Sequence, residues 1–175
     1  PEKLGTEKID AHYAMHVVTK NLRQVDVFGG FTAAAGQSIY TARNYPSEFW
    51  NKVALVCEPT GRLIHKNFIE QVGSGFKEKG DGWNLVASAD EWFGPIQSEV
   101  GPDGNVWITD WYDFIIQHNP TPKGFDNGKG NAHINPLRDH ERGRIYRLVY
   151  KDGAVNAPIS LDKNDKSGLL KALRN

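Results

Sequence analysis

Carboxylates and aromatic side chains gather in two short stretches of this chain, residues 90–93 (DEWF) and residues 110–113 (DWYD). Aromatic rings stack on the C–H faces of sugars, and carboxylates accept hydrogen bonds from sugar hydroxyls. If the fold brings the two stretches together, they predict a surface that binds a carbohydrate or a polyol. The substrate-binding candidates in these stretches are Trp92, Trp111, Tyr112 and Asp113. The alternative is that both tryptophans pack inside the fold.

Proton transfer is a second chemistry that these residues could perform. His118 lies eight residues after Asp110. An imidazole beside a carboxylate is a common general base for the proton of a hydroxyl group. His118 and Asp110 are therefore the catalytic candidates. The alternatives are that His118 is an ordinary surface histidine and that Asp110 accepts a hydrogen bond from a neighbouring backbone N–H.

A carboxylate and an arginine flank an earlier turn, the Pro-Thr-Gly sequence at residues 59–61. Glu58 and Arg62 would share a face with Asp110 if the chain contains an internal repeat. Both are then further substrate-binding candidates, with Arg62 as an anion-binding group. The alternative is a surface ion pair of small energetic value.

The carboxylates at the predicted edge could together hold a hard cation such as calcium through oxygen ligands. They are Asp90, Glu91, Asp110 and Asp113. No Asp-x-Asp-x-Asp loop occurs among them, so the sequence assigns no metal ligand. Solvated carboxylates that cap turns are the alternative.

A β-hairpin is predicted between the two stretches and would place them at one edge. Residues 97–100 form a short predicted strand, and residues 105–110 form a second with alternating apolar and polar side chains. The GPDG sequence between them supplies a fixed φ, a local side-chain cap and a glycine that tolerates positive φ. Because a hairpin reverses the chain, residues 90–93 are expected beside residues 110–113.

Short strands separated by turn signals recur along residues 31–155 and indicate an all-β fold. Two segments resemble each other as strand, turn, strand, loop and strand, about 60 residues apart. A repeat of four-stranded sheets predicts a partial β-propeller of about two to three blades rather than a sandwich. The predicted strands are residues 32–40, 52–57, 62–69, 84–88, 97–100, 105–110 and 143–150, with a polar turn at residues 77–83.

The chain divides into three parts on these patterns. Residues 1–30 are weakly patterned and form an unassigned lead-in or part of a preceding blade. Residues 31–155 hold the predicted blades, with an insertion at residues 114–142. Residues 156–175 are predicted to form a linker and the start of a helical region, with a helix beginning near Lys166. With about two blades in view, closure of a propeller is expected to need residues outside this chain.

Charge and composition argue against some functions. Lys plus Arg and Asp plus Glu both number 21, so the formal net charge is zero. Without a basic run, neither nucleic acid nor an anionic membrane is an expected partner. No apolar run approaches the roughly 18 residues that a membrane-spanning helix needs. The single cysteine, Cys57, follows an apolar run and is predicted to be a small buried residue.

Five motifs in a fixed order carry a resemblance to a known family. They are an IY…YP hairpin, a GSGF turn, the DEWF stretch, VGPDGNVWITDW and GRIYR. In residues 31–150 the chain resembles the β-propeller domain of bacterial membrane-bound and glucose/sorbosone-type dehydrogenases, which are distant relatives of the soluble quinoprotein sugar dehydrogenases. The resemblance implies that further blades and HEAT-like helical repeats of the same protein are its partners.

The same resemblance implies the oxidation of a sugar hydroxyl or hemiacetal, with pyrroloquinoline quinone and calcium as cofactors, in the periplasm or at the cell surface. In catalytic relatives an arginine precedes the PDG turn and pairs with a quinone carboxylate. The matching residues here are Phe93, Gly94, Pro95 and Ile96, and no motif in this chain supports either cofactor. The sequence therefore leaves the enzyme assignment open. The alternative is a non-catalytic propeller that binds carbohydrate or protein and has lost its quinone site.

Overall fold

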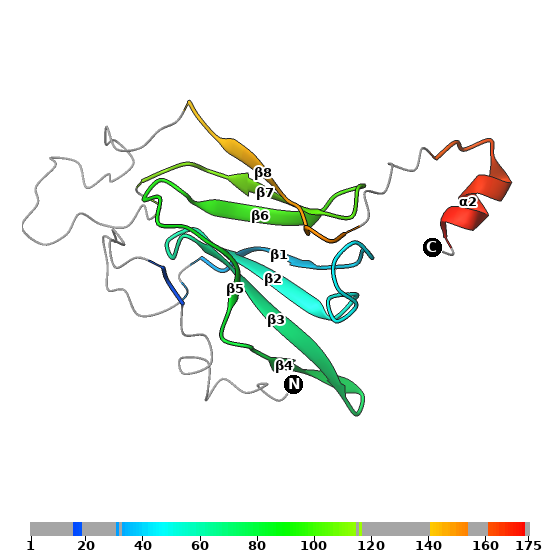
Figure 1. The fold of residues 1–175 in the computed structure, drawn as a ribbon, viewed down its shortest axis with the longest axis horizontal. Helices are drawn as coiled ribbons and strands as arrows, with labels where there is room; N and C mark the ends of the chain where they lie inside the picture. Colours follow the sequence, from blue (N-terminus) through cyan, green and yellow to red (C-terminus); the bar gives the residue numbers. More distant parts are fainter. Residues whose placement is uncertain are drawn as a thin grey trace, which may run out of the picture.

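The computed structural model describes residues 16–18, 31, 33–114, 116, 141–153 and 161–173. Within them lie eight β-strands in two antiparallel sheets and one helix, α2 (Lys166–Ala172) (Figure 1). The all-β prediction is confirmed, and so is a helix that begins at Lys166. No helix in the described part of the chain is long and apolar enough to cross a membrane.

The first sheet contains five strands. β1 (Ala35–Ile39), β2 (Val53–Glu58) and β3 (Leu63–Val72) form its antiparallel centre. β3 is long enough to hold two partners on the same side. β5 (Asn84–Ala87) pairs with its first residues, and β4 (Gly75–Lys79) pairs with its last five. The buried and half-buried side chains of β2 alternate as predicted for a strand with one face in the core.

The second sheet contains the predicted hairpin and one further strand. β6 (Pro95–Val100) and β7 (Val106–Asp110) pair antiparallel, and β8 (Arg144–Leu148) pairs with β7. The turn between β6 and β7 is closed by a hydrogen bond of 2.8 Å from Gly101 N to Asn105 O. Gly104 adopts a φ of 75°, which only glycine adopts readily. The hairpin is therefore confirmed, with its first strand starting two residues earlier than predicted.

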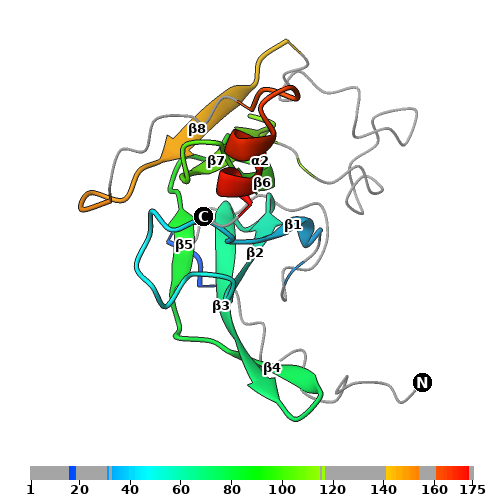
Figure 2. The same ribbon diagram turned by 90° about the vertical axis from the view of Figure 1, so that its right-hand side faces the viewer.

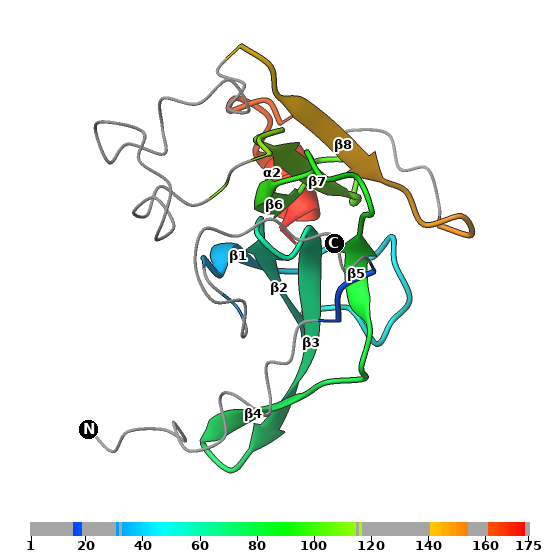
Figure 3. The ribbon, with the colours of Figure 1, turned by 90° about the vertical axis from the view of Figure 1, so that its left-hand side faces the viewer.

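The polar turn predicted at residues 77–83 is wrong, because β4 continues to Lys79. Cross-strand polar pairs hold this charged strand in place. Lys79 Nζ lies 2.9 Å from Glu70 Oε1, and Asn67 Nδ2 donates to Glu78 Oε2 at 2.7 Å. The far end of the β3–β4 hairpin extends beyond the other strands of the first sheet, away from the second sheet (Figures 1 and 3). Its strand character thus comes from pairing rather than from burial, and an apolar pattern could not reveal it.

The two sheets contact each other through their first strands, β1 and β6 (Figure 2). Gly36 has a φ of +55°, and a Cβ at this position would lie 2.4 Å from Ile96 O. A glycine is therefore required where β1 crosses β6. Side chains from both sheets fill the core beside this crossing, and the buried ones are Tyr40, Tyr45, Val53, Leu55, Cys57, Ile64, Val106 and Ile108.

Burial of Cys57 predicts a loss of stability at alkaline pH. Its side chain is 0 % exposed, as predicted. Burial raises the pKa of the thiol to about 11, while a hydrogen bond with Ser98 opposes the rise. An unfolded cysteine ionises near pH 8.5, so the fold keeps the proton longer than the unfolded chain does. The stability due to the neutral thiol is complete below about pH 8.5 and is lost as the pH rises toward 11.

The thermal midpoint of unfolding is accordingly expected to fall between about pH 8 and about pH 10. The Cys57→Ala variant is the control and should fall less over the same interval. Burial also raises the pKa of Tyr45 to about 12, so some alkaline loss remains in the control. Equal pH dependence in the two proteins would contradict this account of Cys57.

Candidate functional site

The two stretches that carry carboxylates and aromatic residues lie side by side, as the hairpin predicted. Gly94 N donates to Asp110 Oδ1 at 2.7 Å, and Trp111 N donates to Gly94 O at 2.9 Å. The rings of Trp92 and Tyr112 are 5.5 Å apart. We call the surface formed by Asp90, Glu91, Trp92, Trp111, Tyr112 and Arg144 the aromatic-acidic edge. It is the candidate functional site.

Asp110 is held by backbone N–H groups. Its side chain is 3 % exposed. The Oδ1 atom accepts from the N–H of Gly94, directly before β6, and from the N–H of Tyr112 at 2.8 Å. The Oδ2 atom is buried and has no hydrogen-bond partner among the described residues. This carboxylate therefore fastens the start of β6 to the backbone after β7, which is the alternative that the sequence left open for it.

Glu58 makes the equivalent bonds in the first sheet. It is 0 % exposed and, like Asp110, is the last residue of the second strand of its sheet. Its Oε2 accepts from the N–H groups of Ala33 and Ala34, directly before β1, at 3.0 and 3.1 Å. Its Oε1 accepts from Thr60 N at 3.3 Å. In both sheets the carboxylate thus bonds the N–H two residues ahead and the N–H before the first strand. The two sheets therefore have the same pattern of carboxylate hydrogen bonds.

Arg62 joins the two sheets through backbone carbonyls. It is 1 % exposed. NH1 donates to Phe93 O and Asp113 O, both at 3.0 Å, and NH2 donates to Phe114 O at 2.8 Å. Burial lowers the pKa of the guanidinium to about 10, and nearby carboxylates, with that of Asp113 first, oppose the change. Arg62, which the sequence suggested as an anion-binding group, therefore uses its guanidinium to donate to carbonyl oxygens before and after the β6–β7 hairpin.

Aromatic rings of the edge contact one another at tilted angles, and an arginine lies over one of them. The ring of Trp92 lies 5.5 Å from that of Tyr112 and 5.6 Å from that of Phe114. The guanidinium carbon of Arg144 lies 3.5 Å from the centroid of the Tyr112 ring. Its NH1 pairs with Asp90 Oδ2 at 3.2 Å. Trp92 therefore packs against the rings of Tyr112 and Phe114. The charged groups of Asp90 and Arg144 lie at the surface of the same edge.

Sequence reasoning missed Arg144 as part of this site. The residue lies beyond the insertion, far in sequence from Asp90, and only the strand register places it opposite Asp110. Its hydrogen bond with Tyr146, together with that to Asp90, holds the pKa of the guanidinium above its usual range. Both contacts therefore favour the cationic form of Arg144.

The remaining candidates differ in how accessible they are. Trp111 is 38 % exposed, whereas Asp113 is 0 % exposed and its carbonyl oxygen accepts from Arg62. His118 lies outside the described residues, as do residues 117–140 of the predicted insertion. Its proposed pairing with Asp110 thus stays a prediction from the sequence.

The described residues do not fit a quinone or a calcium ion. Phe93, Gly94 and Pro95 are buried and carry no charge where a quinone carboxylate would need a cation. Arg62, the buried cation nearby, already donates to three carbonyl oxygens. No group of three or more His, Cys, Asp or Glu side chains in the described ranges is arranged to hold a metal ion.

Comparison with known proteins identifies the family of this chain. The family model of a domain of unknown function, DUF7133, matches residues 3–152. The chain therefore belongs to the DUF7133 family. No curated protein matches the chain, and no solved structure does.

Proposed function

We propose that this DUF7133 chain supplies two neighbouring blades of a β-propeller and that its aromatic-acidic edge binds a carbohydrate or a polyol without catalysis. Two antiparallel sheets that contact through their first strands support the blade arrangement. The matching bonds of Glu58 and Asp110 support it further, because they give both sheets the same plan. The rest of the propeller would come from other segments of the same protein.

Binding of a sugar is supported by the side chains that remain accessible at the edge. Trp111, which directly precedes Tyr112 in the chain, is 38 % exposed. Arg144, which pairs with Asp90, lies over the Tyr112 ring, and that ring contacts Trp92. An exposed indole offers a face for sugar C–H groups. The carboxylate accepts from hydroxyls, and the guanidinium donates to ring or hydroxyl oxygens. This combination of ring and paired charges is the observation that carries the proposal.

The engagement of Glu58, Asp110 and Arg62 favours binding over oxidation. Removing a hydroxyl proton needs an accessible base, but both carboxylates are buried and already accept from backbone N–H groups. A dehydrogenase would therefore need its base and its cofactor groups from outside the described residues. Dye reduction by the full-length protein, incubated with pyrroloquinoline quinone, calcium and a sugar panel, separates the two functions. Turnover with a sugar would overturn the non-catalytic proposal.

Replacing Trp111 by alanine is expected to weaken sugar binding about five- to thirtyfold, because loss of one stacking ring removes roughly 1–2 kcal/mol. Binding would be measured by calorimetric titration of a panel of neutral mono- and oligosaccharides. Trp83→Ala is the matched control, since Trp83 is 74 % exposed and lies at the other end of β5. The control should bind within about twofold of the original protein. Equal loss in both variants, or no binding by the original protein, would contradict the proposal.

A further inference from the structure

Three contacts fix the guanidinium of Arg144 at the aromatic-acidic edge. Its NH1 atom donates to Asp90 Oδ2 and to Tyr146 Oη, both at 3.2 Å. Its central carbon lies 3.5 Å from the centroid of the Tyr112 ring, which is close enough for the flat group to contact the ring face. Because these contacts restrict its rotamers, the guanidinium is largely ordered before a ligand binds.

The ring that supports Arg144 comes from a residue with a strained backbone. Tyr112 has a φ of 55°, in the left-handed region that a residue with a Cβ adopts only at a cost. The hydrogen bond of 2.8 Å from Tyr112 N to Asp110 Oδ1 stabilises this conformation, and the ring also contacts Trp92. Strain of this kind is concentrated at functional sites. The fold thus accepts a backbone cost at the residue whose ring lies against Arg144.

One edge of the Arg144 guanidinium keeps its donors. Its Nε and NH2 atoms donate to no residue in the part of the chain that the structure describes, and the side chain is 39 % exposed. These two nitrogens lie on one side of the planar group, and their parallel N–H bonds match the two oxygens of a carboxylate. Asp90 uses only NH1. Arg144 can therefore pair with Asp90 and bind a second carboxylate at the same time.

Two other arginines of the fold lack this free edge. Arg147 lies on the opposite face of β8, and its Nε is 2.6 Å from Asp103 Oδ2. Arg62 is 1 % exposed and donates to three backbone carbonyls. Of these three arginines, Arg144 is the one that is both ordered and accessible to a ligand.

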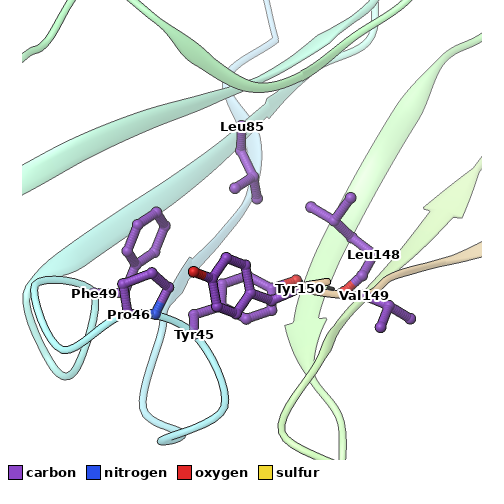
Figure 4. A pocket seen from close by; sticks show the side chains of 7 residues that line it. All are labelled: Tyr45, Pro46, Phe49, Leu85, Leu148, Val149 and Tyr150. Atoms are coloured by element: carbon purple, nitrogen blue, oxygen red, sulfur yellow. Dashed lines mark hydrogen bonds between the residues drawn. The ribbon is translucent and has the colours of Figure 1, made fainter. Parts of the chain in front are cut away.

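An apolar pocket of about 220 Å³ at the other end of β8 is a rival site for a sugar (Figure 4). Its lining residues are Tyr45, Pro46, Phe49, Leu85, Leu148, Val149 and Tyr150. The rings are suited to stacking on a sugar, but none of these side chains is charged, and the Tyr45 hydroxyl already donates to Leu148 O. The pocket therefore offers a neutral sugar and an acidic sugar the same contacts.

We propose that Arg144 makes the aromatic-acidic edge selective for sugars that carry a carboxylate, such as uronic acids. Its Nε and NH2 atoms bind the two carboxylate oxygens of the ligand. Trp111, directly before Tyr112 in the chain and 38 % exposed, supplies the ring face for the sugar. This inference rests on the proposed binding of a carbohydrate and adds the class of carbohydrate that is bound.

The test is the ratio of dissociation constants for matched neutral and acidic sugars, measured by calorimetric titration of the full chain. The pairs are glucose with glucuronate and galactose with galacturonate. The acidic sugar of each pair should bind about five- to tenfold more tightly. Raising sodium chloride from about 0.05 M to about 0.5 M should bring the ratio closer to one. Amide NMR of the isotope-labelled chain should show saturable shifts at residues 90–92, 111–112 and 144.

Two lysine variants separate Arg144 from charge in general. Arg144→Lys keeps the charge but lacks the planar edge, so the acidic sugar should bind less than about twofold more tightly than the neutral one. Arg147→Lys is the matched control, since Arg147 lies on the same strand and its side chain is 41 % exposed. The control should keep the full preference. Neither side chain is buried, so both variants should keep the thermal midpoint.

Three outcomes would overturn the proposal. The first is equal affinity for the neutral and the acidic sugar, and the second is a preference that Arg144→Lys keeps or that Arg147→Lys loses equally. The third is NMR shifts confined to residues 148–150, which would place the sugar in the apolar pocket. If the neutral sugar binds without any preference for its acidic partner, this inference fails and the proposed function stands. If neither sugar binds, the proposed function fails as well.

Discussion

Replacing Arg62 by alanine is expected to lower the free energy of unfolding by about 3–5 kcal/mol. The substitution leaves the carbonyl oxygens of Phe93, Asp113 and Phe114 without their donors. Two of these bonds lie in buried surroundings, where each orphaned acceptor costs about 1–3 kcal/mol. The bonds also tie the first sheet to the second, so their loss should reduce the cooperativity of unfolding. Urea unfolding followed by tryptophan fluorescence measures both quantities.

Arg43 supplies the matched control for Arg62. Its guanidinium donates only to the neighbouring carbonyls of Thr41 and Ala42 and lies over Trp50 at 5.2 Å. Arg43→Ala should therefore cost no more than about 1 kcal/mol. Arg62→Lys keeps the charge but not the planar donors that reach three acceptors. It should therefore lower the free energy of unfolding by most of the amount that Arg62→Ala does. Similar losses at positions 43 and 62 would contradict the role assigned to Arg62.

Replacing Glu58 by alanine is expected to cost about 3–5 kcal/mol, because it leaves three backbone N–H groups without an acceptor. These belong to Ala33, Ala34 and Thr60. Asp110→Ala exposes two such groups, those of Gly94 and Tyr112, and should cost about 2–4 kcal/mol. Thermal and urea unfolding of the two variants give the comparison.

The amide variants provide a sharper control, since the two carboxylates use their oxygens differently. Glu58 accepts through both oxygens, whereas Asp110 accepts both bonds through Oδ1. Glutamine has one acceptor oxygen, so Glu58→Gln must leave a backbone N–H facing an amide group. Asparagine can keep both bonds of Asp110. Glu58→Gln should therefore be the more costly change by about 1 kcal/mol, and the reverse order would refute this assignment of the bonds.

Local patterns were enough to predict the β6–β7 hairpin and most strand positions. The GPDG turn, the alternation before Asp110 and the apolar run before Cys57 each depend on neighbouring residues only. The sequence also placed residues 90–93 beside residues 110–113, because a hairpin leaves no other arrangement. β4 was missed, because its charged side chains are stabilised by partners on β3 that no local pattern reveals.

The roles of Arg62 and Glu58 could not be predicted in the same way. An arginine and a glutamate around a Pro-Thr-Gly turn are usually exposed, and here both are buried. Arg62 is buried because the backbone of Phe93, Asp113 and Phe114 surrounds its guanidinium. These three residues lie more than 30 positions after Arg62 in the sequence, so no local pattern reveals the contact. Arg144 illustrates the same limit, since its neighbours Asp90 and Tyr112 meet it only after the sheet has formed.

Glu58 in the first sheet and Asp110 in the second each bond the backbone before their sheet's first strand and the N–H two residues ahead. Amide hydrogen exchange tests this arrangement most directly, because the four N–H groups concerned lie outside the strands. They belong to Ala34, Thr60, Gly94 and Tyr112. Exchange of all four is predicted to be at least about a hundredfold slower than in an unfolded chain. Exchange at unfolded-chain rates at these positions, with the neighbouring strands protected, would contradict the claim.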